Sequence, residues 1–368
     1  MRAREIGVVI GSGIPGSMNA ITDVRGVRVG HTTLIEGDGP LIVGQGPIRT
    51  GVTVVVPRDG DVWDEPLFAG SHRLNGNGEM TGLEWVRESG LVTSPIGLTT
   101  THSIGAVHEG LIRAEVARRG RGDYWGLPVV AETWDGRLND INGFHVRPDH
   151  VAEALAAAAS GAVAEGNVGG GTGMVCHGFK GGIGTASRVV DDEAGGYTVG
   201  VLVQANYGRR ERLRVNGAAV GDRIPPSEVP LPTPSRATAT PPPGAGSIIV
   251  VIATDAPLLP HQCRRLAQRA GLGVARMGGA GEHWSGDLFI AFATGNRGIP
   301  SSAYGARTPV DAPLSMLADA HITPLFYAVV EATEEAILNA LLAAETMTGV
   351  DGVTAYGLEA DRLLDALG

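Results

Sequence analysis

A Pro-rich segment that ends at an apolar run is the feature of this 368-residue chain that most constrains its fold. The segment spans Ile224 to Gly246 (IPPSEVPLPTPSRATATPPPGAG), and the run that follows is Ser247 to Thr254 (SIIVVIAT). The Pro-rich segment has neither helical nor strand periodicity, so we expect it to be extended and accessible. The apolar run has the length and composition of a buried strand. The sequence therefore predicts a buried strand that begins directly behind an accessible leader.

The Gly246-Ser247 junction has two interpretations. A hydroxyl residue at the head of a strand, preceded by Gly and a flexible leader, is the arrangement from which self-cleaving hydrolases release an N-terminal nucleophile. Cleavage would leave Ser247 with both its hydroxyl and a free α-amine. An α-amine with a reference pKa of about 7.7–8.0 can be the base that such a nucleophile needs near neutral pH. The alternative is a Pro-rich loop that ends at a buried strand, with Ser247 as an ordinary turn residue.

Composition and charge limit the class of protein. Hydrophobic residues make up 43% of the chain and charged residues 18%, so the chain can bury a large core. Gly, at 56 residues, is about twice as frequent as the usual ~7%, which predicts many tight turns and close backbone contacts. The net charge of −10 argues against a nucleic-acid partner, because phosphate binding needs a basic face. We expect the one basic run, Arg209–Arg214, to be a solvated hairpin or an interface patch.

The beginning of the chain and its cysteines indicate the compartment. The first twenty residues contain only one short apolar piece, Ile6–Ile10, which Gly and Pro then interrupt, so we expect neither a signal peptide nor a membrane anchor. Cys176 and Cys263 cannot form a disulfide framework, and we expect two buried reduced thiols. The sequence therefore predicts a soluble cytoplasmic protein without a membrane partner.

Short apolar runs of strand length alternate along the chain with helical patterns. Such a mixture predicts an α/β protein in which helices cover packed sheets. We expect helices over Asp149–Glu165, over Pro260–Ala270, closed by Gly271, and over Thr323–Thr348 as one or two helices. We expect strands over Gly51–Pro57, Leu127–Ala131, Tyr197–Ala205, Ser247–Thr254 and Asp287–Thr294.

Three polar residues at the ends of these strands are candidates for acyl-transfer chemistry. Ser285 and Asp287 lie two positions apart, so both side chains point to one side of a strand. There, the Ser285 hydroxyl could relay a proton between Ser247 and the carboxylate. The side-chain amide of Asn206 could donate a hydrogen bond to an oxyanion, where loss of one donor typically costs about 10²–10³ in rate. Each of the three also has a plainer interpretation as a turn residue.

The sequence predicts no metal centre and no cofactor. The ten histidines are scattered and match neither HExxH nor HxxEH. The stretch Asn167–Gly173 (NVGGGTG) could cradle an anion through backbone N–H groups, but it is neither GxGxxG after a strand nor a phosphate loop. We expect it to serve packing near an active site. His283, close to Ser285, could touch substrate.

Six segments in a fixed order carry a family resemblance. They are Asn19–Thr32 (NAITDVRGVRVGHT), Glu132–Asp140 (ETWDGRLND), Asn167–Arg188 (NVGGGTGMVCHGFKGGIGTASR), Val201–Gly208 (VLVQANYG), the Gly246-Ser247 junction followed by IIVVIATDAPL, and Ser285-Gly286-Asp287. Together they resemble the DmpA/BapA family, which comprises L-aminopeptidase/D-amidase-esterases and β-aminopeptidases. The resemblance covers nearly the whole chain and favours the self-cleavage interpretation.

The resemblance implies a four-layer αββα sandwich, similar in layering to the N-terminal-nucleophile hydrolases but different in connectivity. It implies that an inactive precursor cuts itself into an α chain, residues 1–246, and a β chain, residues 247–368. The α chain would end in the Pro-rich linker 224–246, and both chains would remain in one domain. A homotetramer of such processed protomers is also implied.

The resemblance also assigns roles to individual residues. The nucleophile is Ser247, the second active-site serine is Ser285, and the acidic partner is Asp287, where some members have Glu. The residue that stabilises the oxyanion is Asn206, and Glu132 receives the free amino group of the substrate. The implied substrates are small peptides, amino-acid amides and esters with a free N-terminal amine, which would form an acyl-enzyme on the nucleophile.

One residue departs from the family pattern. A Tyr that family members place near the nucleophile corresponds here to Trp134. Indole keeps a donor N–H but lacks the acid/base capacity of a phenol. Proton handling by that Tyr therefore does not carry over to this chain, which leaves Trp134 a role in packing against the substrate.

Three other functions remain open from the sequence. Ornithine-acetyltransferase-like acyl transferases also process themselves, but they use Thr at the new N-terminus, so Ser247 disfavours them. A non-catalytic regulator could bind a nucleotide at Asn167–Gly173 and stay uncut. A family member altered at Trp134 could cleave itself yet turn over little. The preference among α-L-, α-D- and β-amino acids depends on loops that the sequence does not assemble.

Overall fold

The computed structural model describes residues 1–120, 124–233, 246–301 and 308–368. Part of the Pro-rich linker, residues 234–245, lies outside the described residues. The strands are β1 (Arg28–Glu36), β2 (Ile48–Val56), β3 (Leu67–Gly76), β4 (Leu91–Val92), β5 (Ile96–Thr100), β6 (Val129–Thr133), β7 (Val175–Cys176), β8 (Phe179–Lys180), β9 (Gly182–Val189), β10 (Thr198–Asn206), β11 (Gly246–Thr254), β12 (Ser285–Ala293), β13 (Met347–Thr348) and β14 (Thr354–Ala355). The α-helices are α1 (Leu83–Ser89), α2 (Ile104–Arg119), α3 (Pro148–Ala156), α4 (Val220–Arg223), α5 (Pro260–Arg276), α6 (Thr323–Ala343) and α7 (Ala360–Leu367).

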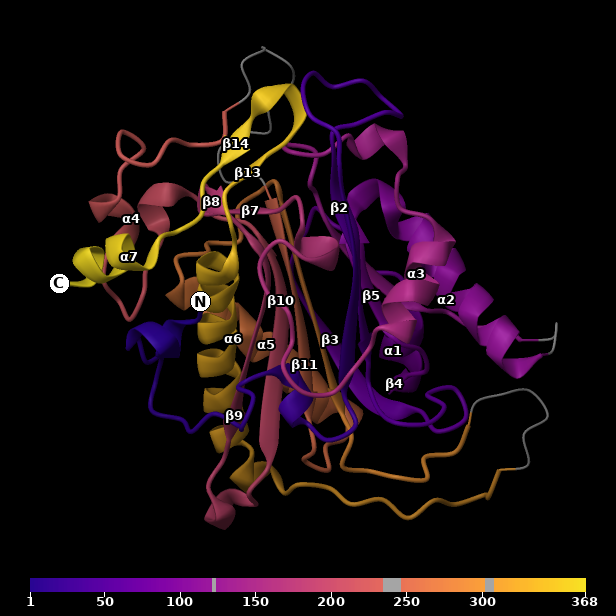
Figure 1. Cartoon of the computed structure of the whole chain (residues 1–368). Helices are drawn as coiled ribbons and strands as arrows, with labels where there is room; N and C mark the ends of the chain where they lie inside the picture. The colour runs from indigo at the N-terminus through magenta and orange to yellow at the C-terminus, as the bar shows by residue number, and fades with distance from the viewer. Residues whose placement is uncertain (121–123, 234–245, 302–307) are drawn as a thin grey trace.

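Two mixed sheets pack face to face, and helices cover the outer face of each. The strand order is β4-β3-β12-β11-β10-β9 in the six-stranded sheet and β1-β2-β5-β6 in the four-stranded sheet. Helices α5 and α6 pack on the six-stranded sheet, and α2 and α3 pack on the four-stranded one. Figure 1 shows α6 on one side of the molecule and α2 with α3 on the other. This arrangement confirms the predicted αββα sandwich.

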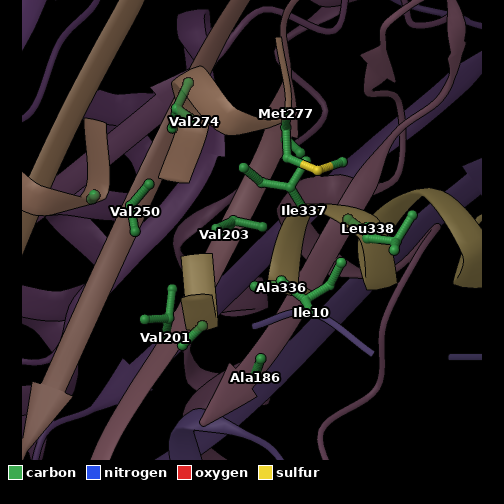
Figure 2. Packing of buried hydrophobic residues seen from close by; sticks show 14 of the residues in the cluster. Ile10, Ala186, Val201, Val203, Val250, Val274, Met277, Ala336, Ile337 and Leu338 are labelled. Carbon is green, nitrogen blue, oxygen red and sulfur yellow. The ribbon is translucent and has the colours of Figure 1, made fainter. Parts of the chain in front are cut away.

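Strand β11 lies inside the six-stranded sheet and is buried on both faces. Alternate residues of a strand point to opposite faces, so Val250 packs toward the helices and Val251 toward the other sheet. Figure 2 shows the cluster on the helix side, which Val250 shares with Val203 of β10 and Ile337 of α6. Burial on both faces explains why this strand reads as a continuous apolar run.

The five predicted strands correspond to β2, β6, β10, β11 and β12, with ends that shift by at most three residues. Two of these shifts bear on the candidate site. Strand β6 extends to Thr133, so Glu132 is a strand residue. Strand β12 begins at Ser285, so Ser285 and Asp287 both belong to it.

Helix α5 is longer than predicted, because it runs past Gly271 to Arg276. A Cβ at Gly273 would lie 2.6 Å from Cβ of Thr333 in α6. A Cβ at Gly271 would find its nearest neighbour at 3.5 Å, in the ring of Phe289. The glycines therefore do not end the helix, and Gly273 lets α5 and α6 approach closely.

Helix α3 is shorter than predicted and ends at Ala156. Beyond it, Ala159 exchanges two backbone hydrogen bonds with Val29 of β1, at 3.0 and 3.1 Å. Pairing with the sheet thus overrides the helix propensity of the Ala-rich run. Likewise, the predicted helical segment Thr323–Thr348 contains a single helix, which ends at Ala343. The last two residues of that segment form β13.

Three expectations from composition have outcomes in the structure. The basic run Arg209–Arg214 is not a solvated hairpin throughout, because Arg210 is buried, stacks 3.5 Å over the Phe179 ring and donates to four backbone carbonyls. Those contacts satisfy a charge that would otherwise be costly to bury. Cys176 and Cys263 are buried free thiols, as predicted. Within the ranges that the structure describes, no helix has the length and apolar character needed to span a membrane.

Replacing Gly273 and Gly271 separately with Ala should change stability in opposite directions. Gly273→Ala must push Thr333 away and should lower the free energy of unfolding by about 1–3 kcal/mol. Gly271→Ala meets only ordinary contact distances and gains up to about 1 kcal/mol of helix propensity. Thermal unfolding followed by circular dichroism measures both variants. An equal shift in both would contradict a tight α5–α6 contact at Gly273.

Candidate active site

Ser247 is the second residue of β11, in the interior of the six-stranded sheet. It is paired with Asn206 of β10 on one side and with Gly286 of β12 on the other. The Gly286 N–H donates to Ser247 Oγ at 3.1 Å, and Ser247 is 4% exposed. The strand order thus brings the predicted nucleophile directly between the predicted oxyanion donor and the Ser-Gly-Asp segment.

Gly246 begins β11 opposite Ser285, so the junction is part of the sheet and not of a loop. A Cβ at Gly246 would lie 2.0 Å from the backbone oxygen of Asn206. Any other residue would therefore force the backbones of β10 and β11 apart. Glycine at this position is a requirement of the close strand pairing.

The side-chain amide of Asn206 is held in one orientation. Its Oδ1 accepts a hydrogen bond from the Val175 N–H, and its Nδ2 donates to the Trp134 carbonyl, both at 2.8 Å. Because one bond needs an acceptor and the other a donor, the hydrogen-bond network fixes which atom is oxygen. These bonds use only one of the two Nδ2 hydrogens, which leaves the second for a ligand.

Ser285 and Asp287 form a buried hydrogen-bonded pair. Ser285 Oγ donates to Asp287 Oδ1 at 2.6 Å. The Asp287 N–H donates to Asn75 Oδ1 at 2.8 Å, which ties the pair to the end of β3. Burial raises the pKa of Asp287 to about 6, and the hydrogen bond from Ser285 opposes that rise. The carboxyl group of Asp287 therefore changes between its protonated and ionised forms at a pH of about 6.

This pair and the Ser247 side chain lie on opposite faces of the sheet. Phe289, two residues after Asp287, packs on the helix side, whereas Ile249, two residues after Ser247, packs between the sheets. The register places the pair beside Gly246. A proton relay from the pair to the Ser247 hydroxyl would therefore have to pass the backbone of the junction itself.

Glu132 is buried in β6, at the edge of the four-stranded sheet. Its Oε1 accepts a hydrogen bond from the Glu79 N–H at 3.0 Å, and its Oε2 accepts one from the Thr101 hydroxyl. Burial raises the pKa of Glu132, and these two hydrogen bonds oppose the rise. A Cβ at Gly78 would lie 3.0 Å from Gly286 Cα and 3.2 Å from Glu132 Oε1. One glycine thus separates this carboxylate from the strand that pairs with the predicted nucleophile.

Trp134 contributes a backbone atom to this arrangement. Its carbonyl accepts the hydrogen bond from Asn206, while its indole packs over Gly136, where a Cβ would lie 2.7 Å from the ring. A carbonyl is available from any residue, so the anchoring of Asn206 does not depend on whether this position holds Tyr or Trp.

The sequence did not reveal the loop Asn75–Glu79 (NGNGE) as part of the site. Asn75 contacts Asp287 across 212 residues of sequence, and Glu79 contacts Glu132. Closely spaced Gly and Asn after a strand are a turn signal. That signal could have marked the loop, but it does not indicate what the loop touches.

Other candidates lie elsewhere or serve packing. The turn Gly169–Gly171 is buried between the sheets, and a Cβ at Gly170 would lie 2.1 Å from Gln204 Oε1. These glycines permit close packing and form no exposed anion cradle. His283 stacks edge-on against Trp284, just before β12. No group of three or more His, Cys, Asp or Glu in the described parts of the chain could hold a metal ion.

Comparisons with known proteins agree over nearly the whole chain. The profile of Peptidase family S58 matches residues 19–355. The beta-peptidyl aminopeptidase BapA of Sphingosinicella microcystinivorans is 51% identical over 359 residues, which is 96% of this chain and 88% of that protein. A Burkholderia sp. beta-aminopeptidase structure superposes with a TM-score of 0.91 at 56% identity, covering 100% of this chain and 98% of that chain.

A second solved structure adds the fold type. The L-aminopeptidase D-Ala-esterase/amidase from Ochrobactrum anthropi superposes with a TM-score of 0.87 at 43% identity, covering 100% of this chain and 98% of that one. It is described as a prototype for the serine aminopeptidases and a new variant among the Ntn hydrolase fold. The fold and its buried serine thus define a hydrolase of this Ntn-like class. The chain belongs to peptidase family S58.

Its function is that of a serine aminopeptidase, as the resemblance to the DmpA/BapA family predicts. The comparisons support neither an ornithine-acetyltransferase-like enzyme nor a nucleotide-binding regulator.

Gly78→Ala should lower kcat/KM by at least about tenfold, because its Cβ would push Glu132 and Gly286 apart and small displacements at a site cost up to about 10²-fold. Gly76→Ala is the matched control, since the nearest atom to its Cβ is in the flexible Arg73 side chain at 3.4 Å. Steady-state kinetics on an amino-acid amide, with melting temperatures for both variants, make the comparison. Wild-type kcat/KM in Gly78→Ala would show that this close contact does not position the site.

Proposed function

We propose that this chain is a precursor that cuts itself between Gly246 and Ser247. The processed enzyme then releases N-terminal residues from peptides, amides or esters through an acyl-enzyme on Ser247. The observation that carries the proposal is the setting of Ser247 in β11, with its Oγ bonded to the Gly286 N–H and Asn206 directly opposite. The aminopeptidase relatives support the same reaction class. The two products are residues 1–246 and 247–368, held in one domain.

Self-cleavage begins when Ser247 Oγ attacks the carbonyl carbon of Gly246. The proton of the hydroxyl passes to the departing nitrogen, the peptide C–N bond breaks, the Ser247 α-amine is released, and an ester joins Gly246 to Ser247 Oγ. Water then hydrolyses the ester, which separates the chains and restores the hydroxyl. The absence of a Cβ at Gly246 supports this step, because it leaves the carbonyl open to attack.

In the processed enzyme, the α-amine of Ser247 is the base for its own hydroxyl. The Ser285–Asp287 pair acts on the amine side of the reaction. This division of roles is supported by the register, in which Ser285 lies opposite Gly246 and so beside the position where the amine is released. With a pKa of about 6, Asp287 is mostly ionised at neutral pH and can accept a proton through the Ser285 hydroxyl.

Asn206 donates its second Nδ2 hydrogen to the oxyanion of the tetrahedral intermediate. Glu132 binds the ammonium group of the substrate. Its two oxygens each accept one hydrogen bond from the protein and retain a lone pair for a further donor. An N-acetylated substrate lacks that charge and is not expected to bind.

The substrate class follows from the chemistry and from the names of the relatives. We propose small peptides, amino-acid amides and esters with a free N-terminal amine, against which the half-buried Trp134 packs. The relatives are named a beta-peptidyl aminopeptidase, a beta-aminopeptidase and, in the Ochrobactrum enzyme, an L-aminopeptidase D-Ala-esterase/amidase. A cytoplasmic homotetramer that needs no metal or cofactor remains a prediction from the sequence.

Purified protein should contain two fragments, and the smaller should begin Ser-Ile-Ile-Val. Ser247→Ala removes the attacking oxygen, so it should remain one inactive chain with a melting temperature near that of the wild-type precursor. Gly246→Ala should process slowly, because its Cβ would collide with the Asn206 oxygen. Intact mass and N-terminal sequencing measure all three proteins. A single full-length chain with aminopeptidase activity would overturn the proposal.

Asp287→Asn should remove a step from the pH–rate profile. The proposed base acts in its ionised form, so kcat of the wild type should fall as the pH is lowered through about 6. The variant should be slow and should lack the fall near pH 6, which leaves only the titration of the Ser247 α-amine at higher pH. Glu132→Gln is the control, since it should raise KM and keep the acidic limb of kcat. A wild-type acidic limb in Asp287→Asn would assign the titration to another group.

A further inference from the structure

A small cavity lies behind the Ser285–Asp287 pair, on the helix side of the six-stranded sheet. Its walls are Tyr207 and Gly208 after β10, the pair itself, and four residues of the loop after α5. Its volume is about 10 Å³, which is about the space that one water molecule needs. A buried water also needs two to four polar partners. The hydroxyls of Tyr207 and Ser285 and the carboxylate of Asp287 can supply them.

Two lining residues of this cavity carry polar groups that the mechanism does not use: Glu282, which is paired with Arg209, and Tyr207. Tyr207 is 4% exposed, and its hydroxyl has no hydrogen-bond partner among the described residues. Burial, followed by the charges of Cys176, Asp287 and Glu334, raises the pKa of Tyr207 well above its ordinary value. The hydroxyl therefore keeps its proton and can donate it to a hydrogen bond. Proteins usually satisfy such buried groups with a protein partner or an ordered water.

Two walls of the cavity, Tyr207 and Ser285, flank Gly246 of the bond that is to be cut. Gly246 lies between β10 and β12, and its Cβ position is 3.2 Å from Tyr207 Cα. Across the three strands, Tyr207, Gly246 and Ser285 are therefore neighbours on one face. Gly246 is not itself a wall of the cavity, but it lies in the sheet between two residues that are, and it has no side chain to cover its carbonyl carbon.

We propose that this cavity binds the water molecule that completes self-cleavage, held between the Tyr207 hydroxyl and the Asp287 carboxylate. The inference rests on the proposed function, because it concerns the hydrolysis of the Gly246–Ser247 ester. Tyr207 is a positioning residue in this step: it orients the water and keeps its own proton.

The step balances as follows. The water oxygen attacks the Gly246 carbonyl carbon, and one water proton passes to Asp287. The bond from that carbon to Ser247 Oγ breaks, and Oγ takes a proton from the α-ammonium group of the same serine. Asp287 returns its proton to that amine. The water oxygen ends in the new carboxyl group of Gly246.

Tyr207→Phe tests the inference, with Tyr197→Phe at the opposite end of β10 as the matched control. Each variant is purified soon after synthesis, and the conversion of the full chain into two fragments is followed by intact mass. We expect Tyr207→Phe to convert at least about tenfold more slowly, the effect of one lost hydrogen bond to the water. We expect the control to convert at the wild-type rate.

Neutral hydroxylamine separates a positioning role from a structural one. It cleaves an ester without the bound water, so it should cut the accumulated Tyr207→Phe chain and leave a hydroxamate on Gly246. If the substitution only distorted the junction, no ester would form and hydroxylamine would not cut. That result, or wild-type conversion of Tyr207→Phe, would overturn the inference. If the wild-type chain itself is not cut at Gly246-Ser247, the proposed function fails instead.

A crystal structure of Ser247→Ala provides a measurement that does not depend on the folding of a Tyr207 variant. This chain cannot form the ester and stays at the precursor stage. We expect an ordered water within hydrogen-bond distance of both the Tyr207 hydroxyl and the Asp287 carboxylate. A cavity without a water in that structure would contradict the inference.

Discussion

The pairing of β11 with β10 and β12 is the interaction on which the rest of this structure depends. The strand is buried on both faces, and its ladders oppose Asn206 to Ser247 and Ser285 to Gly246. A slip of one residue would turn every side chain of β11 to the other face and carry the Ser247 hydroxyl away from the space between the sheets. The apolar contacts that stabilise the protein therefore also set the geometry of its candidate site.

Burial has the same effect on the pKa of the two carboxylates of the candidate site, but their hydrogen-bond partners come from different parts of the chain. Asp287 receives a hydrogen bond from Ser285 on its own strand, whereas Glu132 is held by Glu79 and Thr101 from separate segments. In both, the low-polarity surroundings raise the pKa against the effect of these bonds. The pKa of each carboxylate is thus set by the balance between burial and hydrogen bonding.

The sequence predicted the parts of the site that local patterns define. Strand β11 was found to within one residue because burial on both faces leaves a continuous apolar run. The predicted end of α3 was wrong because pairing of Ala159 with Val29 overrides helix propensity. The predicted end of α5 was wrong because a glycine inside a helix, such as Gly271, cannot be told in sequence from one that ends it. The loop Asn75–Glu79 and the anchoring of Asn206 by Val175 were missed, because these contacts arise only when distant segments fold together.

The strand order has a consequence for how such a protein comes to exist. Strands β4 and β3 precede the junction, β12 and all but the first residue of β11 follow it, and β10 and β9 precede it. Strands from both fragments, residues 1–246 and 247–368, thus alternate within one sheet. Neither fragment therefore contains a contiguous core. Folding is unimolecular while the junction is intact. After a cut, the two fragments would have to meet again to refold, so refolding would be bimolecular. Such a protein would assemble its core once, as a single chain, and afterwards persist through slow unfolding rather than through the ability to refold.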